Sequence, residues 1–372
     1  MNIRSEHWEH IDMRFKTLQN DVDLDNYLAP ANRAAELQRF KEEVNAGRIY
    51  NPQFEYDPLP EIFETELRDL KAELSPNDKV DALFIEAIDH RLGEIRACQT
   101  HDAADVGPLS IQIYGRPDHT VIAAADKNIR DLKPDQEAYN GSKSGRIYDA
   151  HELAELCREA MHRYGFDWKV VVKEEMGAKA AVDNLIREFW IREDVRFHES
   201  LVNMMIVHEI GTHVLRSENG YAQPLKIFGR GMPAYQFTEE GLAEYAEEMT
   251  GNLMDDTVYR ISGRVIGVDT AIRSSFWDVY ETVRPYFDLE MSFDIAQRAK
   301  LGIADTSQPG AYTKDYSYLA GLMAVRKFFK TAQPRQIDAI FAGKVGFRHM
   351  DTVMALQDAG YLVKPPALPE WM

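Results

Sequence analysis

Apolar side chains in the first hundred residues recur every three or four positions among charged ones. This spacing places them along one face of a helix, so each run predicts an amphipathic helix. Proline-containing segments at 51–52 and 56–60 interrupt the pattern. The apolar positions with the clearest helical spacing are Phe63, Leu67, Leu70, Leu74, Val80, Leu83, Phe84, Ala87 and Ile88. We therefore expect residues 1–105 to form an N-terminal helical subdomain, and residues 106–372 to form a second domain or to continue the same unit.

The middle of the chain contains short apolar runs that predict strands. Residues 109–114, 168–173 and 185–193 are rich in branched and aromatic side chains over strand length. The run at 185–193 carries charges beside its apolar positions and predicts an edge strand, to which an extended backbone could add by strand pairing. The alternative is a plain half-buried strand. Residues 151–164 instead have helical spacing and stop at Gly165, so they predict a helix.

A strongly apolar helix follows these strands. Residues 201–207 are largely apolar and lead into His208, and apolar side chains return at 214–215. A helix this apolar belongs in the core. From 238 to about 357 the pattern is again mostly helical, with one helix expected at about 315–330. The expected fold class is therefore α+β, mostly helical, with a small mixed β-sheet beside the apolar helix.

The apolar helix contains the most informative segment for chemistry, residues 208–213, which read His-Glu-Ile-Gly-Thr-His. Buried imidazole and carboxylate groups need partners, and one metal ion would partner them together. The order strand, strand, helix over 168–216 is the one expected around the active-site helix of a zinc peptidase. The alternative is that His208 and His213 are core histidines satisfied by neighbouring side chains.

The spacing of the two histidines requires a local irregularity in the helix. The common zinc-peptidase motif has its histidines four residues apart, on one helical face. His208 and His213 are five residues apart, which separates them by about 140° on a regular α-helix. A π-bulge near Gly211, where the missing side chain lowers the steric cost, would bring the imidazoles together. The sequence therefore predicts a π-type or wide turn within this motif.

A second, acidic segment offers a further ligand. Thr238 is placed to cap a helix, and Glu240 and Glu244 lie four residues apart on one face of it. A catalytic zinc site with two histidines takes a third ligand, often Glu, and Glu240 fits that role. We expect Glu244 to accept a hydrogen bond from the free N–H of a ligand histidine. The alternative is a solvated acidic helix face, and this accounts well for Glu247 and Glu248.

Three blocks of sequence, in this order along the chain, resemble the tyrosine carboxypeptidase family. They are 208–216, 238–243 (Thr-Glu-Glu-Gly-Leu-Ala) and 305–321, which begins Asp-Thr-Ser-Gln-Pro-Gly. Eukaryotic members of this family remove the C-terminal tyrosine of α-tubulin. Bacterial members are often labelled flavohaemoglobin expression-modulating proteins with a Gln-Glu-Gly-Leu-Ala motif. This chain has Glu239 where that motif has Gln, a position next to the expected ligand.

The resemblance extends over roughly residues 165–350 and implies a zinc-dependent carboxypeptidase, whose catalytic domain we expect at 106–372. It implies that one Zn²⁺ per chain is bound by His208, His213 and Glu240. It also implies that Glu209 is the general base that activates water, and the residue types alone point to the same four side chains. The expected substrate is the C-terminus of a peptide or protein, with Tyr or Phe released.

A carboxypeptidase must also hold the terminal carboxylate, which calls for a fixed cation. Lys314 and Tyr318 match family positions in the third block, so we expect Lys314 to contact the substrate carboxylate. Tyr318 is expected to donate a hydrogen bond to the substrate or to the oxyanion. Arg187, Arg192 and Arg216 are rival cations. The alternative for the first two is a turn lysine and a core tyrosine at the start of a helix.

Two other functions remain open from the sequence. One is a metallopeptidase of another cleavage mode, an aminopeptidase or an endopeptidase. The other is a non-enzymatic regulator that keeps the metal for structure. Glu209 argues against the regulator, because a structural zinc site needs no carboxylate base and closes its fourth position with protein.

Composition limits the partners. The net charge of −18 argues against nucleic acid or an anionic membrane as a partner. The two cysteines, Cys98 and Cys157, are far apart in sequence, which is typical of a reducing cytoplasm. The first residues lack the apolar core of a signal peptide, and no apolar run has the length of about 18 residues that a membrane span needs. We expect a cytoplasmic protein, whose oligomeric state the sequence does not indicate.

Overall fold

The computed structural model describes residues 4–19, 22, 24–60, 63–132, 145–174, 176 and 179–372. Most of these residues are helical and the strands form two small sheets, so the expected α+β, mostly helical class is confirmed. Contacts within the chain define two compact units. Unit 1 comprises Met1–Lys16, Pro134–Asp256 and Gly321–Met372, and unit 2 comprises Thr17–Lys133 and Thr257–Ala320.

These units join segments that are distant in sequence, whereas the boundary expected at residue 105 follows the order of the chain. The division expected at residue 105 stays a prediction. Among the helices of the described ranges, none is both long and apolar enough to cross a membrane.

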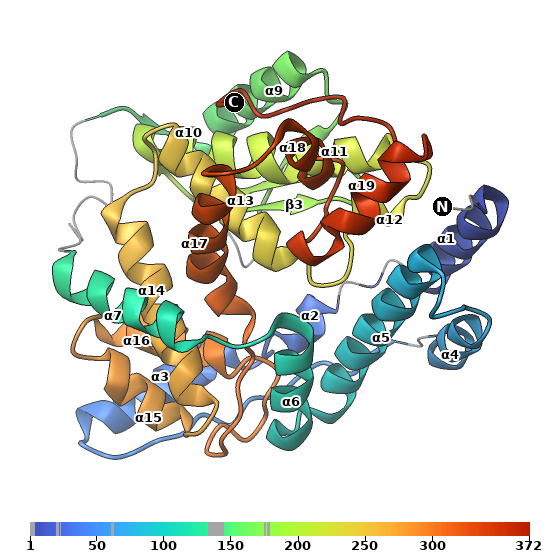
Figure 1. The fold of residues 1–372 in the computed structure, drawn as a ribbon. Coiled ribbons are helices and arrows are strands. Elements are labelled where there is room, and N and C mark those ends of the chain that lie inside the picture. Colours follow the sequence, from blue (N-terminus) through green and yellow to red (C-terminus); the bar gives the residue numbers. More distant parts are fainter. Residues whose placement is uncertain are drawn as a thin grey trace. The chain divides into compact units, whose positions relative to one another are not determined.

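Unit 2 is helical. Its elements are α2 (Asp25–Leu28), α3 (Arg33–Asn45), α4 (Glu64–Ala72), α5 (Lys79–Thr100), α6 (Ala103–Tyr114), α7 (His119–Asp131), most of α14 (Asp255–Ala271), α15 (Phe276–Val283), α16 (Leu289–Ala299) and the 3-10 turn η2 (Lys314–Tyr316). Helix α5 packs against α4 and α6, and α15 packs against α16 (Figure 1).

The strand expected at 109–114 is wrong, because these residues form the second half of α6. An apolar run of this length does not distinguish a strand from a helix by its period. The deciding residue is Asp102, whose side chain accepts a hydrogen bond from the backbone N–H of Ala104 and caps the helix. The helix then continues through Pro108 to Tyr114.

Unit 1 contains the strands and the helices that pack against them. Its elements are α1 (Ser5–Gln19, up to Lys16), β1 (Ile147–Tyr148), α9 (Ala150–Tyr164), β2 (Lys169–Lys173), β3 (Ala180–Asp183), β4 (Glu188–Arg192), β5 (Phe197–His198), α10 (Glu199–Met205), the π-helix η1 (Ile206–Val214), α11 (Leu215–Tyr221), α12 (Ile227–Arg230), α13 (Gln236–Met249), α17 (Ser317–Phe329, from Gly321), α18 (Pro334–Ile340), the 3-10 turn η3 (Phe347–His349) and α19 (Met350–Asp358). The expectation of mostly helical structure after residue 238, with a helix near 315–330, is confirmed.

A three-stranded sheet has the order β2-β4-β3, with β2 parallel and β3 antiparallel to β4. The mixed sheet is confirmed, but the expectation of an edge strand at 185–193 is wrong. Strand β3 was not expected from the sequence, and it pairs with the second side of β4 and makes β4 central. The side chains of Phe189 and Ile191 on β4 are fully buried, as expected for a central strand.

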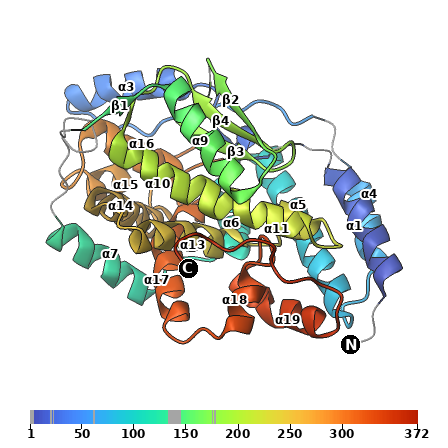
Figure 2. The same cartoon turned by 90° about the horizontal axis from the view of Figure 1, so that it is seen from above.

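Helix α9, expected at 151–164, packs against both the three-stranded sheet and the histidine-bearing helix. Its start is fixed by Asp149, which accepts backbone hydrogen bonds and pairs reciprocally with Glu152 in a capping box. It ends at Gly165, which has a φ of 75°. Helix α9 packs against β2, β4 and η1, and Figure 2 shows it beside the long helix formed by α10, η1 and α11.

Candidate metal centre

The two histidines lie on a π-helix, as their spacing predicts. Residues Ile206–Val214 form η1 between α10 and α11. The hydroxyl of Thr212 donates to the carbonyl oxygen of Val207, five residues earlier, at 3.3 Å. Hydrogen bonding over five residues places positions i and i+5 one above the other. The rings of His208 and His213 consequently have centroids 4.9 Å apart.

Glu240 joins the two histidines from the following helix, α13. Its Oε2 lies 3.9 Å from Nε2 of His208 and 4.0 Å from Nε2 of His213. The three donor atoms lie within 4.8 Å of one another, on half-buried side chains. The structure therefore brings together the three residues that the sequence assigns as metal ligands.

The geometry of these three donors fits a zinc ion. Distances of 3.9 and 4.0 Å are too long for hydrogen bonds, so the donors do not satisfy one another. Tetrahedral zinc with bonds of about 2.0–2.1 Å separates its ligand atoms by about 3.3 Å, so small side-chain rotations would complete the site. His208, His213 and Glu240 could hold the metal and leave a fourth position for water.

Each histidine is anchored through its other ring nitrogen. Nδ1 of His208 lies 2.7 Å from Oε1 of Glu247, and Nδ1 of His213 lies 2.9 Å from Oε1 of Glu239. Carboxylates at Nδ1 fix the tautomer that presents Nε2 to a metal. The alternative of ordinary core histidines accounts for the Nδ1 contacts only, because both Nε2 atoms face Glu240.

These anchors correct two expectations from the sequence. The contact expected of Glu244 is made by Glu247 at His208, while Glu244 lies beside them with a donor atom within 4.8 Å. Glu247 is not on a solvated face, since only 1% of it is exposed. Glu248 does lie on such a face and pairs with Arg326 at 2.8 Å. Glu240, Glu244 and Glu247 have i, i+4, i+7 spacing, so helical periodicity was the signal that could have found Glu247.

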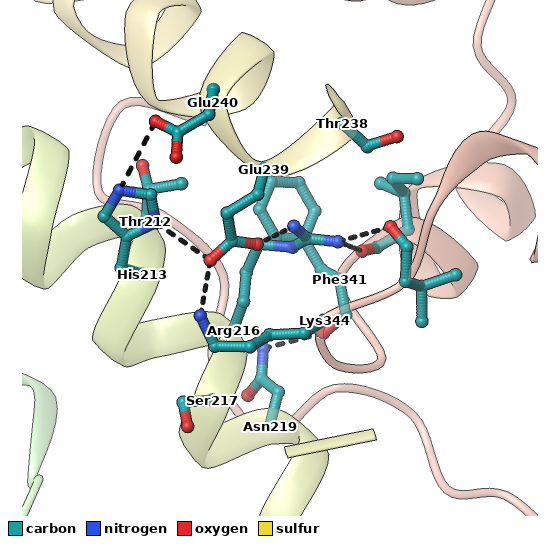
Figure 3. Close-up of polar contacts among 12 residues, drawn as sticks. Thr212, His213, Arg216, Ser217, Asn219, Thr238, Glu239, Glu240, Phe341 and Lys344 are labelled. Carbon is teal, nitrogen blue, oxygen red and sulfur yellow. Dashed lines mark hydrogen bonds and ion pairs between the residues drawn. The ribbon is translucent and has the colours of Figure 1, made fainter. Parts of the chain in front are cut away.

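Glu239 belongs to a buried network that the sequence did not reveal. Its carboxylate accepts hydrogen bonds from His213, Arg216 and Lys344, the last at 2.7 Å (Figure 3). Burial alone would raise the pKa of Glu239, but the charges of Arg216 and Lys344 outweigh it and hold that pKa well below its usual range. No sequence pattern links Lys344 to a residue about a hundred positions earlier.

The start of α13 and its close packing place Glu240. The helix begins at Gln236, so the expectation that Thr238 caps it is wrong. The hydroxyl of Thr238 instead accepts a hydrogen bond from the backbone N–H of Phe347. At Gly241, an added Cβ would lie 2.3 Å from the backbone carbon of Gly321 on α17. Only glycine allows α13 and α17 to approach this closely, and this contact fixes the helix that carries Glu240.

Glu209 follows His208 on η1 and is half-buried. Burial would lower the pKa of His208, but the hydrogen bond to Glu247 and the charges of Glu209, Glu247 and Glu244 raise it well above its usual value. The carboxylate of Glu209 thus acts electrostatically on the first histidine. Its role as a base stays a prediction.

The structure separates the candidate cations. Arg216 is fully buried and donates to Glu239 and to the carbonyl oxygens of Ile340 and Val345, so the expected substrate contact is wrong for this residue. Arg187 pairs with Glu218 at 2.8 Å. Arg192 pairs with Asp194 at 2.6 Å.

Lys314 and Tyr318 belong to unit 2. Lys314 opens the 3-10 turn η2, and the guanidinium of Arg264 lies over the ring of Tyr318, 5.3 Å from its centroid. Their assignment to the substrate stays a prediction.

Comparison with known proteins identifies the family. The sequence profile described as microtubule-associated tyrosine carboxypeptidase matches residues 38–372. The chain therefore belongs to the tyrosine carboxypeptidase family, as the three sequence blocks indicated.

The relatives are considerably longer than the matching region. The human microtubule-associated tyrosine carboxypeptidase 1 is 24% identical over 344 residues, which are 87% of this chain and 60% of the relative. The rat protein of the same name is 25% identical over the same length. The human putative tyrosine carboxypeptidase MATCAP2 is 30% identical over 158 residues, 41% of this chain and 29% of the relative. This chain thus spans about 60% of the length of the first of these relatives.

Proposed function

We propose that this protein is a zinc-dependent carboxypeptidase that releases a C-terminal Tyr or Phe from a peptide or protein. The observation that carries the proposal is the convergence of His208, His213 and Glu240, with both Nδ1 atoms anchored on carboxylates. Family membership supports the cleavage mode and the preference for tyrosine.

In this mechanism each residue of the centre has a distinct task. His208, His213 and Glu240 would hold the ion, and Glu247 and Glu239 would orient the two imidazoles. Zinc bound there would polarise the scissile carbonyl and lower the pKa of water at the open position. The carboxylate of Glu209 would accept a proton from the attacking water and pass it to the leaving amine.

The terminal carboxylate of the substrate needs a separate cation. Lys314 remains our first candidate, with Arg187 and Arg192 as rivals, and Tyr318 as a donor to the substrate or the oxyanion. Support for Lys314 and Tyr318 comes from the third family block alone. Cys98 and Cys157 are both buried thiols, which supports the expected cytoplasmic location.

One pair of peptides tests the cleavage mode. Amidation of a C-terminus removes the charge that the cation would hold and leaves every other contact in place. We expect the zinc-loaded protein to release Tyr from the free acid, and to cut the amide far more slowly, by mass spectrometry. Equal rates would establish an aminopeptidase or endopeptidase instead.

The metal assignment has its own test. Elemental analysis should find one zinc per chain in the wild type and loss of most of it in His208→Ala and Glu240→Ala. Full zinc in both variants would contradict the assignment. Zinc without any peptidase activity would favour a regulatory protein with a structural metal.

A further inference from the structure

Glu239 is held by donors from three separate parts of unit 1. His213 lies on η1, Arg216 on α11, and Lys344 in the segment after α18. The carboxylate and both cations are almost completely buried, with exposed fractions of 2% for Glu239, 0% for Arg216 and 2% for Lys344. Figure 3 shows the carboxylate of Glu239 between these three side chains. A carboxylate bound on several sides has little freedom to turn.

The backbone fixes both cations in turn. Arg216 donates to the carbonyl oxygens of Ile340 at 3.1 Å and Val345 at 2.7 Å. The backbone N–H of Lys344 donates to the carbonyl oxygen of Phe228 at 2.7 Å, and its own carbonyl accepts from Met232 at 3.0 Å. The cations are therefore tied to main-chain positions, and they set the position of the carboxylate between them.

The two histidines of the centre differ in the charge around the carboxylates that contact their Nδ1 atoms. His208 is backed by Glu247, with Glu244 and Glu209 close enough to raise its pKa. Nδ1 of His213 contacts the carboxylate of Glu239. The two positive charges of Arg216 and Lys344 exceed the single negative charge of that carboxylate. Glu239 therefore adds no net negative charge behind its histidine. What it supplies is a rigid acceptor in one direction.

We propose that Glu239, clamped by Arg216 and Lys344, is a positioning unit that aims the His213 imidazole at the metal, and that Lys344 acts on the metal site only through Glu239. This proposal rests on the proposed function in so far as His213 is a zinc ligand. An imidazole N–H bonded to a fixed carboxylate holds the ring and directs Nε2. Loss of the charge on Glu239 leaves two buried cations without an anion, whereas loss of Lys344 leaves a carboxylate–guanidinium pair.

Two measurements on three variants test this proposal. These are the zinc Kd from competition with a chromophoric chelator, and the thermal unfolding midpoint of the zinc-free protein. Glu239→Gln should raise the Kd about 10–100-fold, and Lys344→Met should raise it less. The double variant should bind zinc no more weakly than Glu239→Gln, and should unfold at a higher temperature than it, because one uncompensated cation is gone.

Lys300→Met is the matched control. Lys300 is also a completely buried lysine, but it lies in unit 2 and donates only to backbone carbonyls among its identified contacts. Its acceptors are the carbonyl oxygens of Ala271, Ser274, Gln308 and Gly310. This variant should lower the unfolding midpoint and leave the zinc Kd unchanged.

Distinct outcomes overturn the proposal. Unchanged zinc affinity in both single variants would do so, as would losses that simply add in the double variant. If Glu239→Gln does not fold, Lys344→Met against Lys300→Met decides, and equal zinc affinities in those two would reject the positioning role. A wild-type protein that binds no zinc would defeat the proposed function first, and this proposal with it.

Discussion

Glu239 in unit 1 and Asp315 in unit 2 are both buried carboxylates shared by two cations. Asp315 accepts from Arg298, with one contact at 2.7 Å, and Arg264 lies 3.6 Å away. Burial alone would raise the pKa of Asp315, but the charges of Arg298 and Arg264 hold it well below its usual range. Each residue lies in a block that resembles the family, so the sequence alone does not separate them.

The difference between them is the third partner. Glu239 also accepts from His213, which faces Glu240 through its other nitrogen. The partners identified for Asp315 are guanidinium groups, which join α14 and α16 to the start of η2. A buried carboxylate in a family motif is therefore not a functional residue by position alone. Its role depends on the residue to which it is hydrogen-bonded.

The largest effect is expected at the general base proposed in unit 1. Glu209→Gln should lower the rate of tyrosine release by about 10²–10⁴-fold, because Gln cannot accept the proton of water. Zinc content should stay at the wild-type value. Glu248→Gln, a change at an exposed glutamate of α13, is the control and should keep its rate. A Glu209→Gln enzyme with half of the wild-type rate would remove the base from the mechanism.

Asp315→Asn should sharpen the contrast with Glu239. Because it leaves two guanidiniums without their anion, we expect the free energy of unfolding to fall by about 3–5 kcal/mol. The zinc Kd of the folded protein should not change. Urea denaturation and chelator competition on the same sample measure the two quantities. A weakened zinc site would show that the Asp315 network also serves the metal centre.

Low pH should reduce the contribution of both carboxylates to the free energy of unfolding. A group whose folded pKa lies below its unfolded value contributes stability that is complete above the unfolded pKa and is lost as pH falls through the folded pKa. Unfolded carboxyls titrate near pH 4, so the stability from Asp315 and Glu239 should decline below that pH. Asp315→Asn should show the shallower decline, with a difference of about 1.4 kcal/mol for each pH unit below 4, in urea denaturation from pH 6 to pH 3. Identical slopes would show that Asp315 is not depressed in the folded state.

The smallest effects distinguish two glycines of the motifs. Gly241→Ala should cost about 1–3 kcal/mol of stability and weaken zinc binding, because the new methyl group forces α13, with Glu240, away from Gly321. At Gly211, the nearest atom to an added Cβ is the Tyr164 hydroxyl at 3.6 Å, an ordinary contact. Gly211→Ala should therefore stay within about 1 kcal/mol of the wild type and keep its zinc. Equal behaviour of the two variants would contradict the packing argument.

Local geometry was predictable from the sequence where neighbours along the chain determine it. The spacing of His208 and His213 led to the π-helix, and ligand chemistry led to Glu240. The strand at 180–183 was missed, and with it the central place of β4, because pairing partners are set by tertiary contacts. The contact between Lys344 and Glu239 could not be predicted for the same reason, since no neighbouring sequence indicates it.

The distance in sequence between Glu239 and Lys344, 105 positions, has a consequence for synthesis of the protein. At about 5–20 residues per second, a ribosome needs about 5–20 s to add Lys344 after Glu239. During that interval the nascent chain already contains both histidines and Glu240, but the clamp behind His213 is incomplete. Metal that arrives before Lys344 has packed on Glu239 would meet an incomplete site, whereas metal that reaches the folded chain would meet an oriented one.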